Sequence, residues 1–305
     1  MTIHTLDLGF KNLEHTIAAF VLEGPTGLVL VETGPYSTFS NLEKALAAKG
    51  WKPADIAHVF VSHIHFDHAG AAWAMARRGA KIYVHPRGLP HLASPERLYN
   101  SARMIYGDAM DTLWGAMEPI PESQLYAPEH GETIDAGGLQ FTAWYTPGHA
   151  VHHIAWEVAL PDSPVETHVL FTGDVAGVRI DEQRVVPPCP PPDINIEDWL
   201  ASIQLIRELP VPTLYLTHFG KITNKSEHLD ELAKRLVIWA NWMKPYAEKQ
   251  TPTAEIVPAF ENFVREELES AGISGLALEQ YEAANPAYMS VAGLLRYWNK
   301  KQSAA

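Results

Sequence analysis

One short stretch places three histidines and an aspartate within six residues, directly after an apolar run, and it restricts the fold more than any other part of the chain. The run from Ile56 to Val61 predicts a buried β-strand. Side chains alternate between the two faces of an extended chain, so His63 and His65 point the same way and can bind one metal ion together. Clustered buried histidines that neither bind metal nor catalyse are hard to satisfy. The stretch therefore predicts a metal site at the end of a strand.

Asp67 and His68 stand where this extended chain turns into a segment of small residues, Ala69 to Met75, that predicts a helix. The turn carries their side chains to a second position beside the first, so the motif favours a site for two ions. Imidazole suits zinc, iron, copper and nickel, and a carboxylate also tolerates harder ions. The residue types alone leave the metal open.

The motif resembles the H-x-H-x-D-H signature of the metallo-β-lactamase superfamily, and three later positions match the rest of that pattern. The turn 146–149, Thr-Pro-Gly-His, resembles the family's third histidine turn, and the turn 171–174, Phe-Thr-Gly-Asp, resembles its bridging aspartate turn. His218 follows a predicted strand, as the last ligand of the family does. The resemblance covers roughly residues 1–245, and its motifs are specific in combination.

The resemblance implies an α/β chain folded as a four-layer αββα sandwich with a dinuclear metal centre. Its ligands would form two sets, His63, His65 and His149 in one and Asp67, His68 and His218 in the other, with Asp174 bridging them. We expect two divalent ions, zinc ahead of iron and manganese, which would acidify a bridging water to a hydroxide that attacks a carbonyl group. Asp67 would be the catalytic residue as well as a ligand, because it can pass a proton to the leaving group.

The motif is closest in character to those of glyoxalase II and the lactonases, which implies a metallo-hydrolase that cleaves an ester, thioester or lactone of a small molecule. Lactonases of acyl-homoserine lactones carry a tyrosine shortly after the bridging aspartate, whereas Val175 and Ala176 follow Asp174 here. That activity therefore ranks second. The C-terminal helices also lack resemblance to the glutathione-binding region of glyoxalase II. Two other classes stay open: a mononuclear iron oxidoreductase similar to persulfide dioxygenases, and a non-catalytic binding protein.

Several positions near the motif have open roles. Glu32-Thr33-Gly34 replaces the family's Asp-x-Gly turn, so a contact of Glu32 or Thr33 with the metal ligands is undecided. His153 aligns with a histidine that relatives often place beside the ligands, although a role in the core is the alternative. His152 stands where relatives commonly have glycine and receives no role. Cys189 is interpreted as structural or incidental.

We expect a metallo-β-lactamase domain over residues 1–250 and a helical extension over residues 251–305 packed on it. The domain contains an insert, 88–121, with predicted helices at 96–106 and 109–117. The insert either folds over the metal site as a lid or packs its apolar side on the sandwich, since its apolar residues, Met104 and Ile105 among them, must be covered. The proline-rich segment 187–193 predicts a rigid loop beside the site, and Asp193 or Asn195 begins the next helix.

Composition limits the partners. The formal net charge of −13 argues against the basic face that nucleic-acid binding requires. No apolar segment is long enough to cross a bilayer and the N-terminus lacks a signal pattern, so a cytoplasmic location is expected without membrane association. The remaining partners are a small-molecule substrate and, through aromatic residues of the C-terminal helices, a second copy in a homodimer.

Overall fold

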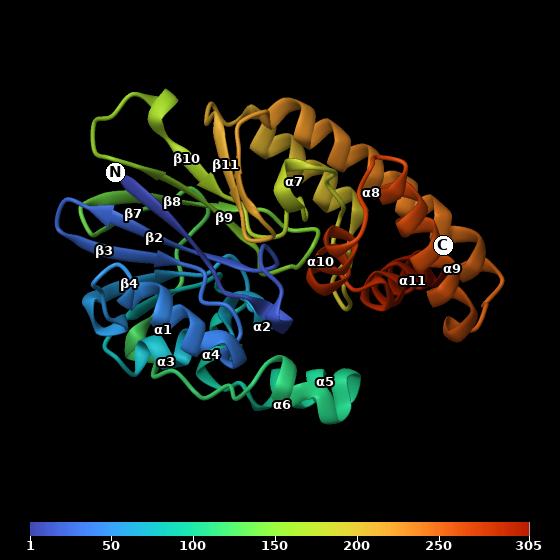
Figure 1. Ribbon diagram of the computed structural model, residues 1–305, viewed down its shortest axis with the longest axis horizontal. Coiled ribbons are helices and arrows are strands. Elements are labelled where there is room, and N and C mark those ends of the chain that lie inside the picture. The colour runs from blue at the N-terminus through green and yellow to red at the C-terminus, as the bar shows by residue number, and fades with distance from the viewer. Residues whose placement is uncertain (305) are drawn as a thin grey trace.

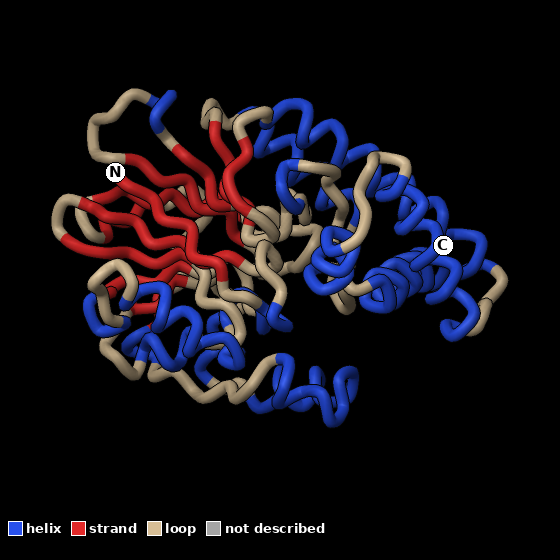
Figure 2. Tube along the Cα trace, in the orientation of Figure 1, coloured by secondary structure: helices blue, strands red, loops and turns tan. Residues whose placement is uncertain are grey.

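The computed structural model describes residues 1–304, which form two six-stranded sheets packed face to face. The first sheet has the strand order β1 (Thr2–Asp7), β2 (Ala18–Gly24), β3 (Gly27–Val31), β4 (Ile56–Phe60), β5 (Lys81–Tyr83) and β6 (Leu125–Tyr126). The second has the order β12 (Gly220–Ile222), β11 (Thr213–Leu216), β10 (Val169–Phe171), β9 (Ile154–Ala159), β8 (Leu139–Tyr145) and β7 (Thr133–Ala136). Both sheets mix parallel and antiparallel pairs. Helices lie outside the two sheets (Figures 1 and 2), so the predicted α/β, αββα sandwich is confirmed.

Burial of the central strand β4 on both faces explains why its sequence does not alternate between apolar and polar residues. Val59 packs toward the outer helices, whereas Phe60 packs between the sheets, so both faces of the strand are buried. Between the sheets, the ring of Phe60 stacks on that of Phe141 with a centroid distance of 3.9 Å and meets Trp156 edge-on at 4.9 Å. These aromatic contacts join the strand that leads into the metal motif to the opposite sheet.

Each sheet has its own covering helices. Helices α1 (Phe39–Ala47) and α3 (Ala72–Ala76) share a hydrophobic core with the first sheet, and α7 (Ile196–Glu208) and α8 (Lys225–Glu248) share one with the second. Helix α7 begins as predicted at Asn195, whose side chain accepts a hydrogen bond from the Asp198 N–H at 3.1 Å.

The C-terminal helices α9 (Thr253–Glu269), α10 (Leu276–Ala284) and α11 (Ala287–Ala304) continue the core of the second sheet beyond its end (Figure 1). Phe260 of α9 meets Trp239 of α8 edge-on at 5.0 Å, and Tyr281 is buried in the same core. No helix in residues 1–304 has both the length and the apolar character that a membrane span requires.

The insert contains α4 (Leu89–Ala93), α5 (Glu96–Tyr106) and α6 (Met110–Leu113). Helix α5 has the predicted bounds, while α6 is shorter than predicted because the chain turns at Gly115, which has a φ of +72°. The expectation that every apolar residue of the insert is covered is wrong. Met104 is 83% exposed and Ile105 49% exposed, since α5 has only one packed side.

Hydrogen bonds between the sheets fix the strand ends where the predicted ligands lie. The carbonyl oxygen of Ser62 accepts from the N–H of Ile154 at 2.7 Å, and that of Thr217 accepts from the N–H of Ala18 at 2.8 Å. Because each bond ties a residue next to a predicted ligand to the other sheet, the two sheets hold one common set of side chains.

Candidate metal centre

All seven predicted ligands meet at one edge of the sandwich, in turns that follow β4, β8, β10 and β11. The motif turn differs from its prediction in one detail: helix α2 (Phe66–Ala69) begins inside the motif, so Asp67 and His68 lie in its first turns. The segment 69–75, for which one helix was predicted, contains the last residue of α2 and most of a separate helix, α3. The hydroxyl of Thr33 donates to the carbonyl oxygen of His68 at 2.9 Å and holds the end of α2 in place.

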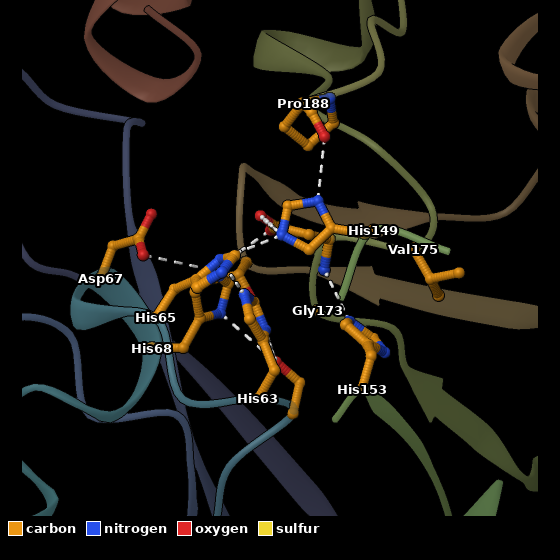
Figure 3. A network of polar contacts seen from close by, with 12 residues as sticks. His63, His65, Asp67, His68, His149, His153, Gly173, Val175 and Pro188 are labelled. Carbon is orange, nitrogen blue, oxygen red and sulfur yellow. Dashed lines mark hydrogen bonds and ion pairs between the residues drawn. The ribbon is translucent and has the colours of Figure 1, made fainter. Parts of the chain in front are cut away.

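The first set of histidines converges closely (Figure 3). The Nε2 of His63 lies 2.8 Å from the Nδ1 of His65, and the Nε2 of His149 lies 3.1 Å from that same nitrogen. The three ring nitrogens therefore lie close enough to share one ion.

The second set is held more loosely. The Nε2 of His218 lies 3.5 Å from Oδ2 of Asp67, and the Nε2 of His68 lies 3.8 Å from Oδ1 of that carboxylate. Ligand atoms of all three residues fall within 4.8 Å of one another, so this trio can also surround an ion.

Asp174 lies between the two sets, with one carboxylate oxygen toward each. Its Oδ2 is 3.3 Å from the Nε2 of His149, in the first set. Its Oδ1 is 3.2 Å from the Nε2 of His68 and 3.4 Å from that of His218, in the second. A carboxylate in this position can bind two cations at once and reduce their repulsion.

Three atoms of this cluster are buried and have no hydrogen-bond partner within residues 1–304: Nε2 of His68, Nε2 of His218 and Oδ1 of Asp174. Buried polar atoms in folded proteins are almost always satisfied. These three atoms face one another, and a divalent cation among them would satisfy all of them. The donor set of imidazoles and carboxylates thus fits divalent metal ions.

Charge interactions within the cluster are strong. Burial acts to raise the pKa of Asp174, but the neighbouring His68 and His218 hold it well below its usual value. Burial likewise opposes the charge on His68, yet Asp174 and Asp67 raise its pKa well above the usual value. Burial, helped by His149, lowers the pKa of His65 to about 4. Ionised carboxylates and a neutral His65 are the forms that bind a cation, which would displace the proton of His68.

The predicted ligands are oriented through their second ring nitrogens. The Nδ1–H of His149 donates to the carbonyl oxygen of Pro188 at 2.9 Å, and that of His218 donates to the carbonyl oxygen of Thr16. These bonds leave Nε2 of both rings free to face Asp174 and fix the tautomer that a metal ligand needs. Pro188 belongs to the proline-rich segment, which lies beside the site as predicted.

Glu32 contacts the ligand cluster, which the sequence had left undecided. Its buried carboxylate lies 3.3 Å from the Nδ1 of His68 through Oε1, and it accepts from the Ser62 N–H at 3.3 Å. Its φ is +63°, an unusual backbone conformation that lets the side chain reach the cluster from the end of β3. The available signal was a glutamate in the place of the aspartate of the family's Asp-x-Gly turn.

Two glycines make close approaches that no other residue would allow. At Gly173, with a φ of +48°, an added Cβ would lie 2.4 Å from Oγ of Ser62 and 2.7 Å from Nε2 of His153. At Gly148, with a φ of +130°, it would lie 2.3 Å from the Cα of Trp199 in α7. The turns that carry Asp174 and His149 therefore depend on these glycines.

A cavity of about 620 Å³ opens beside the cluster. His65, Asp67, Asp174 and His218 line its inner end. Much of the remaining wall comes from four regions: the segment between β1 and β2, the insert, the proline-rich segment, and the end of α10 with the start of α11. These regions include Phe10, Leu98, Tyr106, Trp114, Pro190, Pro286 and Met289. The Tyr106 hydroxyl reaches across to Sδ of Met289 at 3.8 Å, so the insert and the C-terminal helices enclose the cavity between them.

His152 also lines this cavity, although the sequence assigned it no role. It is only 8% exposed, its Nε2 lies 3.9 Å from Oδ2 of Asp193, and its ring meets that of His65 edge-on with a centroid distance of 5.7 Å. A histidine where relatives commonly have glycine was the signal that could have drawn attention to it. Cys189 is fully buried outside the ligand cluster, in agreement with a structural role.

Comparison with known proteins agrees with the fold. The model of the metallo-beta-lactamase superfamily matches residues 14–218. The metallo-beta-lactamase fold-containing protein ST1585 of Sulfurisphaera tokodaii is 26% identical over 248 residues, which cover 78% of this chain and 87% of that protein. The crystal structure of ST1585 superposes with a TM-score of 0.65 at 22% identity and covers 98% of both chains.

Two more matches are more distant. The family protein TTHA1429 of Thermus thermophilus has a TM-score of 0.65 at 19% identity, covering 98% of this chain and 94% of that one, which shows a shared fold. The hydroxyacylglutathione hydrolase of Pseudomonas aeruginosa is 30% identical over 125 residues, or 41% of this chain and 33% of that enzyme. Because the family model covers well over half of the sequence and the sandwich agrees with it, the chain belongs to the metallo-β-lactamase superfamily.

Proposed function

We propose that the protein is a metal-dependent hydrolase that cleaves an ester, thioester or lactone of a small molecule. The superfamily consists mostly of hydrolases, and a hydroxyacylglutathione hydrolase is among the relatives. The observation that carries the proposal is the position of Asp174, whose two oxygens face two different sets of ligands at the inner end of an apolar cavity. A volume of about 620 Å³ is typical of small-molecule sites.

The seven ligands would hold two divalent ions, zinc ahead of iron and manganese. Bound there, such ions supply Lewis acidity, which polarises a carbonyl oxygen and lowers the pKa of water. The protein contributes the geometry: His63, His65 and His149 hold one position, and Asp174 keeps a negative charge between the two. The apolar cavity walls hold the organic part of the substrate and exclude bulk water.

Asp67 is the residue that we assign to proton transfer. Both carboxylates of the cluster line the cavity, but the side chain of Asp67 is 20% exposed and that of Asp174 only 5%, so Asp67 is the more accessible of the two. From there a carboxylate can accept a proton from the attacking water and give it to the leaving group. The insert would act as a lid over this reaction, because Tyr106 and Trp114 line the same cavity.

An activity panel tests the proposal. Metal-loaded protein is assayed with ester, thioester and lactone substrates, including an acyl-homoserine lactone, beside protein stripped of metal and the variant Asp67→Asn. We expect hydrolysis of at least one class, loss of activity on stripping, and a lower rate in the variant. Absence of hydrolysis across the panel with fully loaded protein would overturn the proposal.

A further inference from the structure

Three basic side chains at the start of the insert line the cavity and have no acidic partner. Arg87 precedes α4, His91 lies in α4, and Arg97 lies in the first turn of α5. We call them the basic wall. Within residues 1–304, the side chains of Arg87 and Arg97 make neither a hydrogen bond nor an ion pair, whereas five other arginines form ion pairs: Arg77, Arg78, Arg184, Arg207 and Arg235. Arg87 and Arg97 are exposed where they border the cavity and His91 is half-buried, so the basic wall lies at the cavity's solvent side in a chain with a net charge of −13.

The acids that share the cavity form no ion pair with the basic wall within residues 1–304. Asp193 lies 3.9 Å from Nε2 of His152. Glu282 accepts from the Ala287 N–H at 3.4 Å at the start of α11. Asp67 and Asp174 face the ligand histidines. Each acid therefore has its contacts elsewhere, and none of them pairs with a side chain of the basic wall.

The remaining walls are largely apolar, although one further cation, Lys11, lies outside the basic wall in the segment between β1 and β2. Ile64, Phe66, Leu98, Ala102 and Trp114 are among the residues that line the space between the ligand cluster and the insert. Walls of low dielectric strengthen the field of a nearby cation and attract an anion into the cavity. A guanidinium group also matches a carboxylate or phosphate through two parallel N–H donors.

We propose that the basic wall binds an anionic group of the substrate, so that the substrate is an ester or thioester with a carboxylate or phosphate set apart from the scissile bond. This inference rests on the proposed function, whose ligand cluster would hold the scissile carbonyl at the inner end of the same cavity. The anion belongs either to the acyl part, as in the half-ester of a dicarboxylic acid, or to the leaving group, as in a phosphorylated thiol.

Matched substrate pairs separate these two sources. For the acyl part, the p-nitrophenyl half-ester of glutaric acid is compared with p-nitrophenyl pentanoate, which has the same chain length without the charge. For the leaving group, the pentanoyl thioester of 4′-phosphopantetheine is compared with that of pantetheine. The proteins are the wild type, the double variant Arg87→Gln/Arg97→Gln, and the control Arg103→Gln, which lies on α5 but does not line the cavity.

The wild type should favour the charged member of one pair in kcat/KM by about tenfold or more, as expected for charge-assisted hydrogen bonds. In the double variant, kcat/KM should be about equal for the charged and the uncharged substrate, and the metal content should be unchanged. The Arg103→Gln control should keep the preference of the wild type. The pair that shows the preference identifies the source of the anion. Equal rates for both members of both pairs, or a preference that survives in the double variant, would overturn the inference.

Calorimetric measurement of glutarate and pentanoate binding separates failure of this inference from failure of the proposed function. Glutarate and pentanoate share one carboxylate that can reach the ligand cluster, and only glutarate has a second for the basic wall. If no ester is hydrolysed, the proposed function fails, but tighter binding of glutarate than pentanoate in the wild type alone would still support the basic wall. Equal affinities would refute it.

Discussion

The Nε2 of His153 accepts a hydrogen bond from the backbone N–H of Asp174 at 3.2 Å. On its other side, the Nδ1–H of His153 donates to the hydroxyl of Thr146 at 2.8 Å. The ring is fully buried, and burial lowers its pKa well below the usual value, so it remains neutral with a fixed tautomer. His153 thus positions the peptide that carries the shared carboxylate without contributing a ligand atom to the cluster.

Replacing His153 with Ala should weaken metal binding about tenfold or more, because Asp174 loses the bond that orients its backbone. The measurement is competition of the protein with a chelator for the metal. The control is His168→Ala, whose ring pairs with Glu157 away from the site. Equal metal affinity in the His153 variant and the wild type would show that this hydrogen bond does not position Asp174.

Replacing Glu32 with Gln should also lower metal affinity about tenfold, because the Nδ1–H of His68 then faces a neutral amide instead of a carboxylate. The matched control is Glu23→Gln, since Glu23 contacts His4 at 2.6 Å far from the cluster. Metal content at limiting metal concentration checks the effect. If both variants retain the same metal content as the wild type, the contact of Glu32 with His68 has no role in binding.

Shrinking Tyr106 to Ala should change the preference for acyl chain length more than it changes metal content or melting temperature. Tyr106 lines the cavity and touches Met289 on the opposite side, so its removal enlarges the space for an acyl chain. Rates with esters of increasing chain length measure the change, and Met104→Ala, exposed on the same helix, is the control. A lower melting temperature with an unchanged chain-length profile would show that the insert only packs on the sandwich.

The stability of the metal-free protein should fall with pH partly through His228. Burial, with the nearby Arg179, lowers the pKa of His228 to about 4, and its Nε2–H donates to the carbonyl oxygen of Ala176 at 2.7 Å. The unfolded ring takes up a proton below about pH 6.5, while the folded ring stays neutral down to about pH 4. The free energy of unfolding therefore decreases through this window as pH falls, by up to roughly 3 kcal/mol from this residue.

The variant His228→Gln keeps a donor and an acceptor but cannot be protonated, so its free energy of unfolding should depend less on pH between 6.5 and 4. Urea unfolding of both metal-free proteins across this range measures the difference. The ligand histidines are present in both proteins, so their contributions cancel in the comparison. Parallel pH profiles would contradict the assignment.

The ligand cluster could be predicted from the sequence because its motif and its later turns resemble the ligand pattern of the metallo-β-lactamase superfamily, and the structure brings these residues together at one edge of the sandwich. The contact of Glu32 with His68 could not, since it depends on a positive φ at the end of β3 and on packing between residues distant in sequence. The exposure of Met104 and Ile105 was also missed. An apolar helix pattern indicates that a covered side exists, but it does not give the width of that side.

The cavity required the folded chain for a different reason. Its walls combine the segment between β1 and β2, the insert, the proline-rich segment and the junction of α10 with α11. None of these segments carries a motif that predicts its position relative to the others. The positions of His152 and the basic wall beside the cavity can be recognised only in the folded chain. Their residue types alone are equally consistent with an ordinary solvated surface.

Metal stoichiometry of the wild type and of Asp174→Ala, measured by elemental analysis of protein purified without added metal, tests most directly whether Asp174 joins two metal positions. We predict about two divalent ions per wild-type chain, and fewer in the variant, because two nearby cations lose the carboxylate that reduces their repulsion. One iron per wild-type chain would favour an oxidoreductase, and none a binding protein. Full occupancy of both positions in Asp174→Ala would contradict the bridging role.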